Sequence, residues 1–235
     1  MKSIILLLGS IFFFYAPLHG QEAVRLFARY SIKQKAGDKG QLVTGEVYFD
    51  KKVRKLCYKV QYPEPSFRII QDSTLFEFSS DTQLVRTSAI QYNPTFSIYQ
   101  MLLDDPSTDL GLKKLGFRAG KVEKMDSTVI VEWLPAPKWD KKLGKVLVSS
   151  VHKRVNAVVY FTPDGQVAAG EQYNQPVWIN DRWLPTQMIS IVPGNNKAPD
   201  QITITSLSQL LINDTEHRFF YDFPLPVPAH SPAAY

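Results

Sequence analysis

Apolar and polar residues alternate along this chain with a period of two, and the pattern recurs often enough to predict the fold class. Between Val24 and Lys33, apolar side chains occupy nearly every second position, and the same alternation returns at 43–49 and 56–62. Because successive side chains of a strand point to opposite faces, this pattern predicts strands with one apolar and one polar face. Turn-forming residues at 34–41 and 50–52 separate these strands, so we expect an antiparallel meander.

The rest of the chain predicts more strands and one helical interruption. The stretch "NPTFSIYQMLLDD" changes to helical spacing, with Asn93 as a cap and Pro94 at the first helical position. A long antiparallel sheet must close, split or be covered on its apolar face, and this helix is the expected cover. Further strands are expected at 68–71, 75–78, 83–89, 121–124, 129–134, 145–152, 157–162, 167–172, 183–192 and 201–212.

The amino-terminal residues predict export. An apolar run over residues 4–18 follows Lys2 and ends in Pro17 and Gly20, which is typical of a secretory signal peptide. A membrane anchor is the alternative, but the run is shorter than the roughly 20 residues that a spanning helix needs. We predict cleavage near Gly20, one domain at 21–228 and a flexible, proline-rich tail at 229–235.

Composition and motifs argue against several classes of function. The formal net charge is +5 without a long run of lysine or arginine, so we predict no nucleic-acid partner. Cys57 is the only cysteine, which excludes a disulfide within the chain and predicts a free, partly exposed thiol. No nucleophile, metal-binding or phosphate-binding motif is present, and acidic pairs such as Asp104-Asp105 lie beside turn residues. We predict no catalysis, no cofactor and no metal.

Several strands are apolar on both faces, and two interpretations remain open. In "LFEFSS" and "VIVEWLP", aromatic and branched residues occupy both sides of the alternation. A core covered on both sides explains such strands in most proteins, and composition favours it. The functional alternative is a cavity lined by aromatic residues and fitted to an acyl chain.

The order of motifs resembles the LolA-like family, the periplasmic lipoprotein carriers and their relatives. The stretches that carry the resemblance are "YPEPSFRII", "NPTFSIYQMLLDD", "STVIVEWLP", a P-D-G hairpin, "WLPTQMISI" and "ITITSLSQLLIND" followed by "FFYDFPLP". They span most of the chain beyond the predicted signal peptide. The resemblance implies a mainly β fold, a half-open antiparallel β-barrel with a helical lid over its concave face.

The resemblance also implies a function and a set of site residues. It implies a periplasmic, monomeric, non-catalytic carrier or chaperone that takes acyl chains of lipoproteins or other amphiphilic cargo from an inner-membrane donor to an outer-membrane acceptor. The alternative is a non-catalytic envelope assembly subunit whose concave sheet binds a protein or peptide. The residues assigned to the cavity and lid are Val47, Phe49, Tyr58, Val60, Phe67, Ile69, Phe76, Phe78, Phe96, Tyr99, Leu102, Leu103, Val131 and Trp133.

Arg68 lies between Phe67 and Ile69 in "YPEPSFRII" and has two interpretations. Alternation alone allows a solvated strand residue that faces away from its neighbours. The resemblance implies a latch, because the matching arginine of the carriers holds the lid closed by hydrogen bonds to its backbone.

Overall fold

The computed structural model describes residues 24–89, 99, 103, 109–179, 182–194 and 198–226. The predicted signal peptide, its cleavage point, the carboxyl-terminal tail and most of the predicted lid helix, including Phe96 and Leu102, lie outside these residues. Within the described ranges, no helix is both long and apolar enough to cross a membrane.

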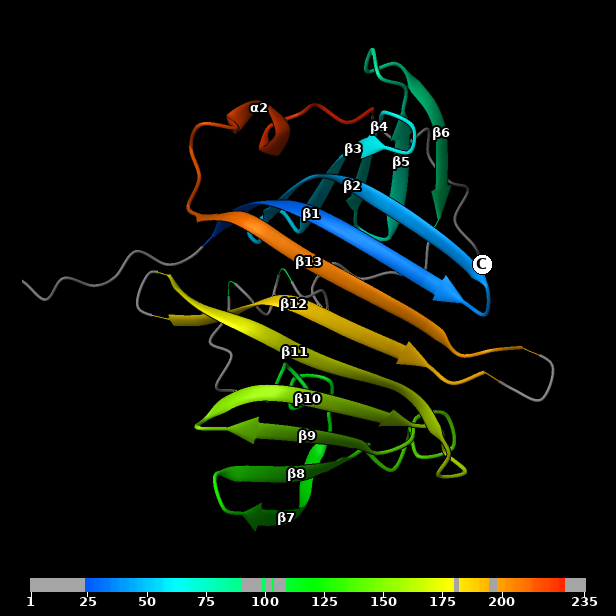
Figure 1. Cartoon of the computed structure of the whole chain (residues 1–235), viewed down its shortest axis with the longest axis vertical. Coiled ribbons are helices and arrows are strands. Elements are labelled where there is room, and N and C mark those ends of the chain that lie inside the picture. Colours follow the sequence, from blue (N-terminus) through cyan, green and yellow to red (C-terminus); the bar gives the residue numbers. More distant parts are fainter. Residues whose placement is uncertain are drawn as a thin grey trace, which may run out of the picture.

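The described chain forms one antiparallel sheet of thirteen strands (Figure 1). The spatial order is β6-β5-β4-β3-β2-β1-β13-β12-β11-β10-β9-β8-β7, so every sequential neighbour is paired except β6 and β7, which form the two edges. The strands are β1 (Arg25–Ala36), β2 (Lys39–Asp50), β3 (Lys55–Tyr62), β4 (Ser66–Gln71), β5 (Thr74–Phe78), β6 (Leu84–Ala89), β7 (Arg118–Met125), β8 (Thr128–Leu134), β9 (Val146–Val151), β10 (Arg154–Phe161), β11 (Val167–Ile179), β12 (Arg182–Val192) and β13 (Gln201–Ile212).

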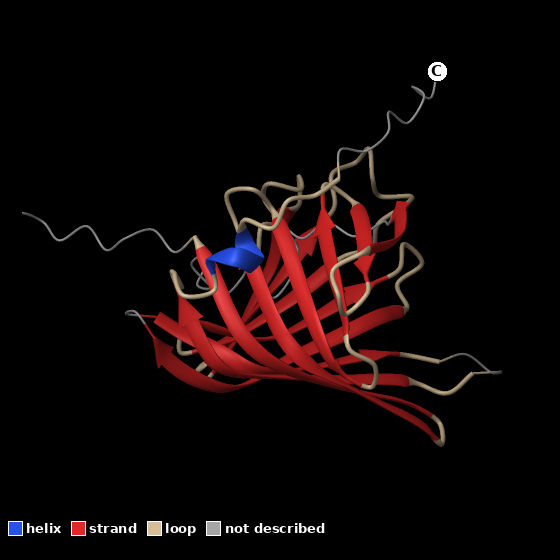
Figure 2. Ribbon diagram, turned by 90° about the horizontal axis from the view of Figure 1, so that it is seen from above, coloured by secondary structure: helices blue, strands red, loops and turns tan. Residues whose placement is uncertain are grey.

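The sheet curves strongly and does not close on itself (Figure 2). β6 and β7 are not bonded to each other, so the predicted fold class, a half-open antiparallel barrel, is confirmed. The turn between β1 and β2 is shorter than predicted, because only Gly37 and Asp38 separate the two strands. Gly37 has a φ of +59°, a conformation that glycine adopts without steric cost.

The strand register separates the side chains onto two faces. Val47 is paired with Tyr58, Tyr58 with Arg68 and Arg68 with Glu77, and directly paired residues of antiparallel strands lie on the same face. The same register continues across the other strands to Val148 on β9. We call the face that carries these residues the inner face and the opposite one the outer face.

Two apolar clusters occupy the inner face. The first lies on β1 to β3, β12 and β13 and includes Tyr99 and Leu103 from the predicted lid. The second lies on β8 to β10 and is packed against residues that precede β7. The buried residues of the first cluster are Leu26, Ala28, Tyr30, Val47, Phe49, Leu56, Tyr99, Leu103, Leu184, Leu207 and Leu210, and those of the second are Leu112, Phe117, Trp133, Val146, Val148 and Val158.

A carboxyl-terminal segment, residues 214–225, covers the outer face of the first strands. It contains the single-turn helix α2 (Arg218–Tyr221) and lies at the top of Figure 1, above β1. We call this segment the outer strap. The cluster beneath and within it contains Phe27, Tyr48, Cys57, Phe67, Ile69, Phe76, Phe78, Phe220, Tyr221, Phe223 and Leu225.

The outer strap buries the only cysteine of the chain. Cys57 is 1% exposed, so the expectation of a partly exposed thiol is wrong. Alternation places Cys57 on the more polar face of β3, but the strap adds a layer of aromatic side chains over that face. Burial raises the pKa of the Cys57 thiol well above its ordinary value, which makes it a poor nucleophile.

Polar contacts fasten the outer strap to the sheet at two points. The Lys55 ammonium donates hydrogen bonds to the backbone carbonyls of Tyr221 and Phe223, at 3.1 and 2.5 Å. The Arg25 guanidinium bridges Asp50 at 2.8 Å and Asp222 at 2.9 Å. These contacts hold the strap in register with β1 to β3.

Candidate functional site

The inner face of β1 to β3 is the best candidate for a functional surface, because it is apolar and its cover comes from a separate segment. Tyr99 and Leu103 are both helical and are 3% and 2% exposed. The Tyr58 and Tyr99 hydroxyl oxygens lie 3.4 Å apart, and their rings meet nearly edge to face. The described part of the predicted lid is therefore packed on the inner face.

The inner face of the second half is also covered by residues that precede β7. Leu112 and Phe117 are buried against Trp133, Val146 and Val148. The Lys113 ammonium lies 6.0 Å from the centre of the Trp133 ring. All these covering residues belong to the connection between β6 and β7, which we call the cover segment (residues 90–117).

The predicted cavity residues divide between the two faces. Val47, Phe49 and Tyr58 pack with Tyr99 and Leu103, Val131 and Trp133 belong to the second inner cluster, and Val60 is buried on the inner face opposite Gly45. The other four described residues point away from the inner face, because their pairing partners in β3 to β5 lie under the outer strap. These four are Phe67, Ile69, Phe76 and Phe78.

Arg68 lies on the inner face, opposite its sequence neighbours Phe67 and Ile69. Its Nε atom is 3.4 Å from a carboxylate oxygen of Glu77, and its side chain is 51% exposed. Burial raises the pKa of Tyr30 to about 12, and the nearby positive charge of Arg68 acts in the opposite direction. Arg68 is paired with Tyr58, whose ring contacts Tyr30, so it lies at the border of the buried aromatic surface.

Tyr30, Tyr58 and Tyr99 form a continuous aromatic group beside Arg68. The Tyr30 and Tyr58 rings lie 5.5 Å apart at 86°, and Tyr58 contacts Tyr99. Tyr30 is absent from the predicted site, although its position in the β1 alternation places it on the same side as Val47. Gly45 is paired with Tyr30, and a Cβ atom there would lie 3.0 Å from the Tyr30 hydroxyl and too close to the Lys59 carbonyl.

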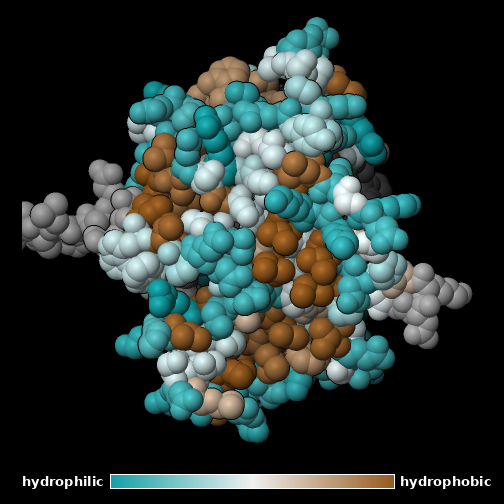
Figure 3. Space-filling model, viewed as in Figure 1, coloured by the Kyte–Doolittle hydropathy of each residue, from teal (hydrophilic) through white to brown (hydrophobic). Residues whose placement is uncertain are grey.

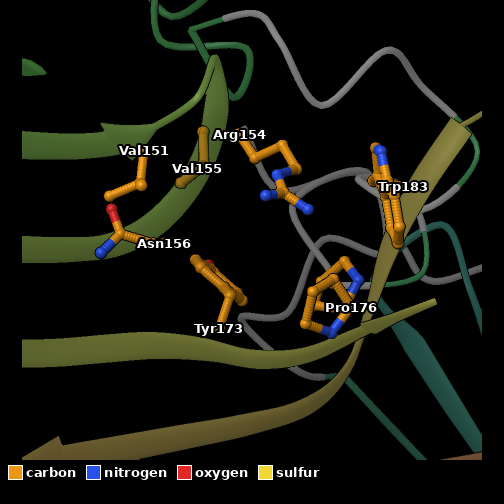
Figure 4. Close-up of a pocket in the computed structure, with 8 residues that line it drawn as sticks. Val151, Arg154, Val155, Asn156, Tyr173, Pro176 and Trp183 are labelled. Carbon is orange, nitrogen blue, oxygen red and sulfur yellow. The ribbon is translucent and has the colours of Figure 1, made fainter. Parts of the chain in front are cut away.

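A small pocket lies at the ends of β9 to β12, near the β9–β10 turn (Figure 4). Its volume is 140 Å³. The residues that line it are Val151, Arg154, Val155, Asn156, Tyr173, Pro176, Trp183 and Pro185. Sequence reasoning did not identify this pocket, because its residues come from two hairpins and form no motif.

On the described part of the inner face, titratable side chains do not gather as a metal site would require. Among the residues that the structure describes, no three histidine, cysteine, aspartate or glutamate side chains lie close enough together to hold a metal ion. Glu46 is a buried acid that lies on the outer face, paired with Arg29 across the strands. It accepts a hydrogen bond from the Tyr48 hydroxyl at 2.8 Å and pairs with Lys59 at 3.3 Å.

Comparison with known proteins identifies relatives by structure alone. No known sequence family matches the chain, and no curated protein does either. A LolA superfamily protein from Nitrosomonas europaea is 14% identical over 84% of this chain and 90% of its own, with a TM-score of 0.56. A putative outer membrane lipoprotein-sorting protein domain from Vibrio parahaemolyticus is 14% identical over 84% and 89%, with a TM-score of 0.55.

A third structure supports the same assignment. A DUF1329 family protein from Desulfovibrio piger is 12% identical over 86% of this chain and 91% of its own, with a TM-score of 0.57. All three matches extend over most of both chains, so the likeness concerns the whole half-barrel. The chain therefore has the half-open β-barrel fold of the LolA-like proteins, and the resemblance predicted from the order of its motifs is confirmed for the fold.

Proposed function

We propose that this protein is a non-catalytic periplasmic carrier that holds the acyl chains of lipoproteins or other amphiphiles on its inner face. The observation that carries the proposal is the apolar inner face, which is covered in both halves by one segment outside the sheet. Removing that cover exposes apolar surface while the strand ladder stays intact. The protein would receive its cargo from an inner-membrane donor and pass it to an outer-membrane acceptor.

The free energies of burial allow an acyl chain to replace the cover on the inner face. Exposing Tyr99 and Leu103 costs about 3–6 kcal/mol in lost burial. Burying a C16 chain gains up to about 12 kcal/mol, at roughly 0.8 kcal/mol per methylene. Cargo binding therefore shifts the population from a covered to an open form.

The comparisons support the proposal at the level of fold. The Vibrio parahaemolyticus structure is described as a putative lipoprotein-sorting domain, and its fold covers most of this chain. An acyl-binding inner face is compatible with the cluster that contains Tyr99 and Leu103. The direction of transport and the two membrane partners are part of the proposal.

Extraction of bound lipid tests the proposal. We expect protein purified from its native envelope to release acyl species, close to one amphiphile per protein, when extracted with organic solvent and measured by mass spectrometry. Ile32→Arg places a charge on the inner face and should lower this yield, because a buried charge opposes an apolar ligand. Protein with no acyl species and no affinity for a fluorescent fatty acid would contradict the proposal.

Ile204→Arg is the matched control for Ile32→Arg. Ile204 is paired with Lys33, the next residue along β1, so it lies on the outer face. Both isoleucines are partly buried, so the two variants differ mainly in the face that receives the charge. We expect Ile204→Arg to retain the wild-type yield of bound lipid.

An envelope assembly subunit is the second candidate, and the outer face favours it. Ile189 is paired with Ile204 and Ile191 with Ile202, so four isoleucines lie together on the outer face of β12 and β13. Ile191 is 41% exposed, and Figure 3 shows apolar side chains grouped over these strands. A stable protein partner on the outer face, together with an inner face free of lipid, would support this candidate over the carrier.

Arg68 is proposed as the latch of the cover, because it borders the aromatic group that contacts Tyr99. We expect Arg68→Leu to retain cargo and to slow its transfer to acceptor vesicles about tenfold, whereas Arg68→Lys keeps the charge and part of the rate. The measurement is the transfer rate of a fluorescent acyl cargo. Arg86→Leu is the control, because Arg86 approaches the same Glu77 at 4.0 Å but is 69% exposed. Transfer by Arg68→Leu at the wild-type rate would remove Arg68 from this role.

A further inference from the structure

Two prolines face each other in the sheet beside the pocket. Pro176 on β11 is paired with Pro185 on β12, and neither has a backbone N–H group to donate across the ladder. Between Asn174 and Pro176, Gln175 has a φ of +51°, so the strand is distorted at this point. Prolines facing each other inside two long strands weaken the backbone pairing there and leave side chains to form the wall of the pocket.

One positively charged residue, Arg154, lines this otherwise mostly apolar pocket. The Arg154 guanidinium lies over the Trp183 ring, 4.9 Å from its centre (Figure 4). Among the described acidic side chains, none forms an ion pair with Arg154, whereas Arg25, Arg68 and Arg218 are each paired. The N–H groups of the Arg154 guanidinium therefore remain available to donate hydrogen bonds to a bound anion.

The surroundings favour an anion rather than a cation at this position. Arg154 follows His152 and Lys153 in the β9–β10 turn, so basic side chains precede it. The Glu171 carboxylate accepts a hydrogen bond from the Tyr173 hydroxyl at 2.6 Å and is not among the residues that line the pocket. Asn156 also lines the pocket and adds an uncharged amide beside Arg154.

We propose that this pocket binds the anionic end of an amphiphile, a carboxylate or a phosphate, through Arg154. The inference rests on the proposed carrier function and adds the chemistry of the polar end of the cargo. A guanidinium forms short, charge-assisted hydrogen bonds with both anions, and Trp183 holds its plane in place. The carbons next to the anion pack against Tyr173, Pro176 and Trp183.

The size of the pocket limits what it holds. An apolar cavity of about 150 Å³ accommodates a molecule the size of benzene, so a pocket of 140 Å³ holds only the first few carbons of a chain. Val155 and Tyr173 of the pocket pack against the second inner cluster, so the rest of the chain would continue from them along the inner face. The pocket is thus a recognition site for one end of the ligand.

Binding of matched fatty ligands tests this assignment. The probes are palmitic acid, hexadecyl phosphate and the uncharged methyl palmitate, titrated into the whole protein by calorimetry, with inorganic phosphate as a fourth probe. We expect Arg154→Gln to weaken binding of both charged amphiphiles at least tenfold and to leave methyl palmitate unchanged. Inorganic phosphate alone should bind weakly, because it has no chain to bury.

Each outcome separates the headgroup site from the carrier function. Equal affinities of wild type and Arg154→Gln for palmitic acid would overturn the headgroup site and leave the carrier function standing. Failure of all three amphiphiles to bind wild type would overturn both. Tight binding of inorganic phosphate, lost in Arg154→Gln, would show a phosphate site rather than an amphiphile site. Arg118→Gln, at an exposed residue of the β7 edge, should behave as wild type.

Discussion

A cross-link between positions 58 and 99 is expected to abolish uptake of a C16 cargo. In the variant Tyr58→Cys/Tyr99→Cys, a short bismaleimide would join β3 to the cover segment at the point where the two hydroxyls lie 3.4 Å apart. The cover would then stay on the first inner cluster, and an acyl chain could not replace it. We expect at least a tenfold loss of affinity for a fluorescent C16 fatty acid, measured by titration.

Three controls test whether the loss of affinity comes from the cross-link. Native Cys57 is buried and its pKa is raised, so it should not react with the maleimide in the folded protein. Each single-cysteine variant should bind as tightly after treatment as before. A linker with a cleavable disulfide should restore binding on reduction. If the cross-linked protein bound cargo with unchanged affinity, the first inner cluster would not be the acyl site.

Lys55→Met is expected to detach the outer strap and to lower the free energy of unfolding by about 2 kcal/mol. The variant keeps a long apolar side chain but removes the donor to the Tyr221 and Phe223 carbonyls. A hydrogen bond from a charged group contributes about 1.5–3 kcal/mol. Burial lowers the pKa of Lys55 by disfavouring its charge, which offsets part of that gain.

Two measurements check the Lys55→Met prediction. For a chain of this size, 2 kcal/mol corresponds to a fall in Tm of roughly 4–8 °C. Labelling of Cys57 by a thiol reagent should also become faster, because the strap covers this residue. Lys33→Met, at an exposed position of β1, should change the stability by less than about 0.5 kcal/mol. Unchanged Tm and unchanged labelling in Lys55→Met would show that the carbonyl contacts do not hold the strap.

The strands could be predicted because their pattern is local. The bounds predicted for Gln201–Ile212 match β13, and most other strands differ by only a few residues. β11 is the main exception, since it continues past Pro176 to Ile179 although it was expected to end near Gln172. A proline normally ends a strand, but Pro176 lies beyond Gln172, the last β11 residue paired with β10, so only β12 borders the strand there.

The assignment of faces could not be predicted from alternation alone. Alternation shows that Arg68 and Phe67 point in opposite directions, but only the pairing of Arg68 with Tyr58 places the arginine on the inner face. The four phenylalanine and isoleucine positions assigned to the cavity in β4 and β5 lie instead under the outer strap. That strap is distant in sequence from the strands it covers, and its helix of four residues is too short to give a periodic pattern.

The cover segment connects the two open edges of the sheet, β6 and β7. The chain leaves one rim at Ala89 and returns on the opposite rim at Arg118, and Tyr99 and Leu103 belong to the connection between them. No strand pairing joins the rims, and their separation depends on how strongly the sheet bends. A flatter sheet would separate the two rims further, so we expect it to weaken the contact of Tyr99 and Leu103 with their cluster. A partner that flattens the sheet from its outer face would then loosen the cover without contacting the cargo.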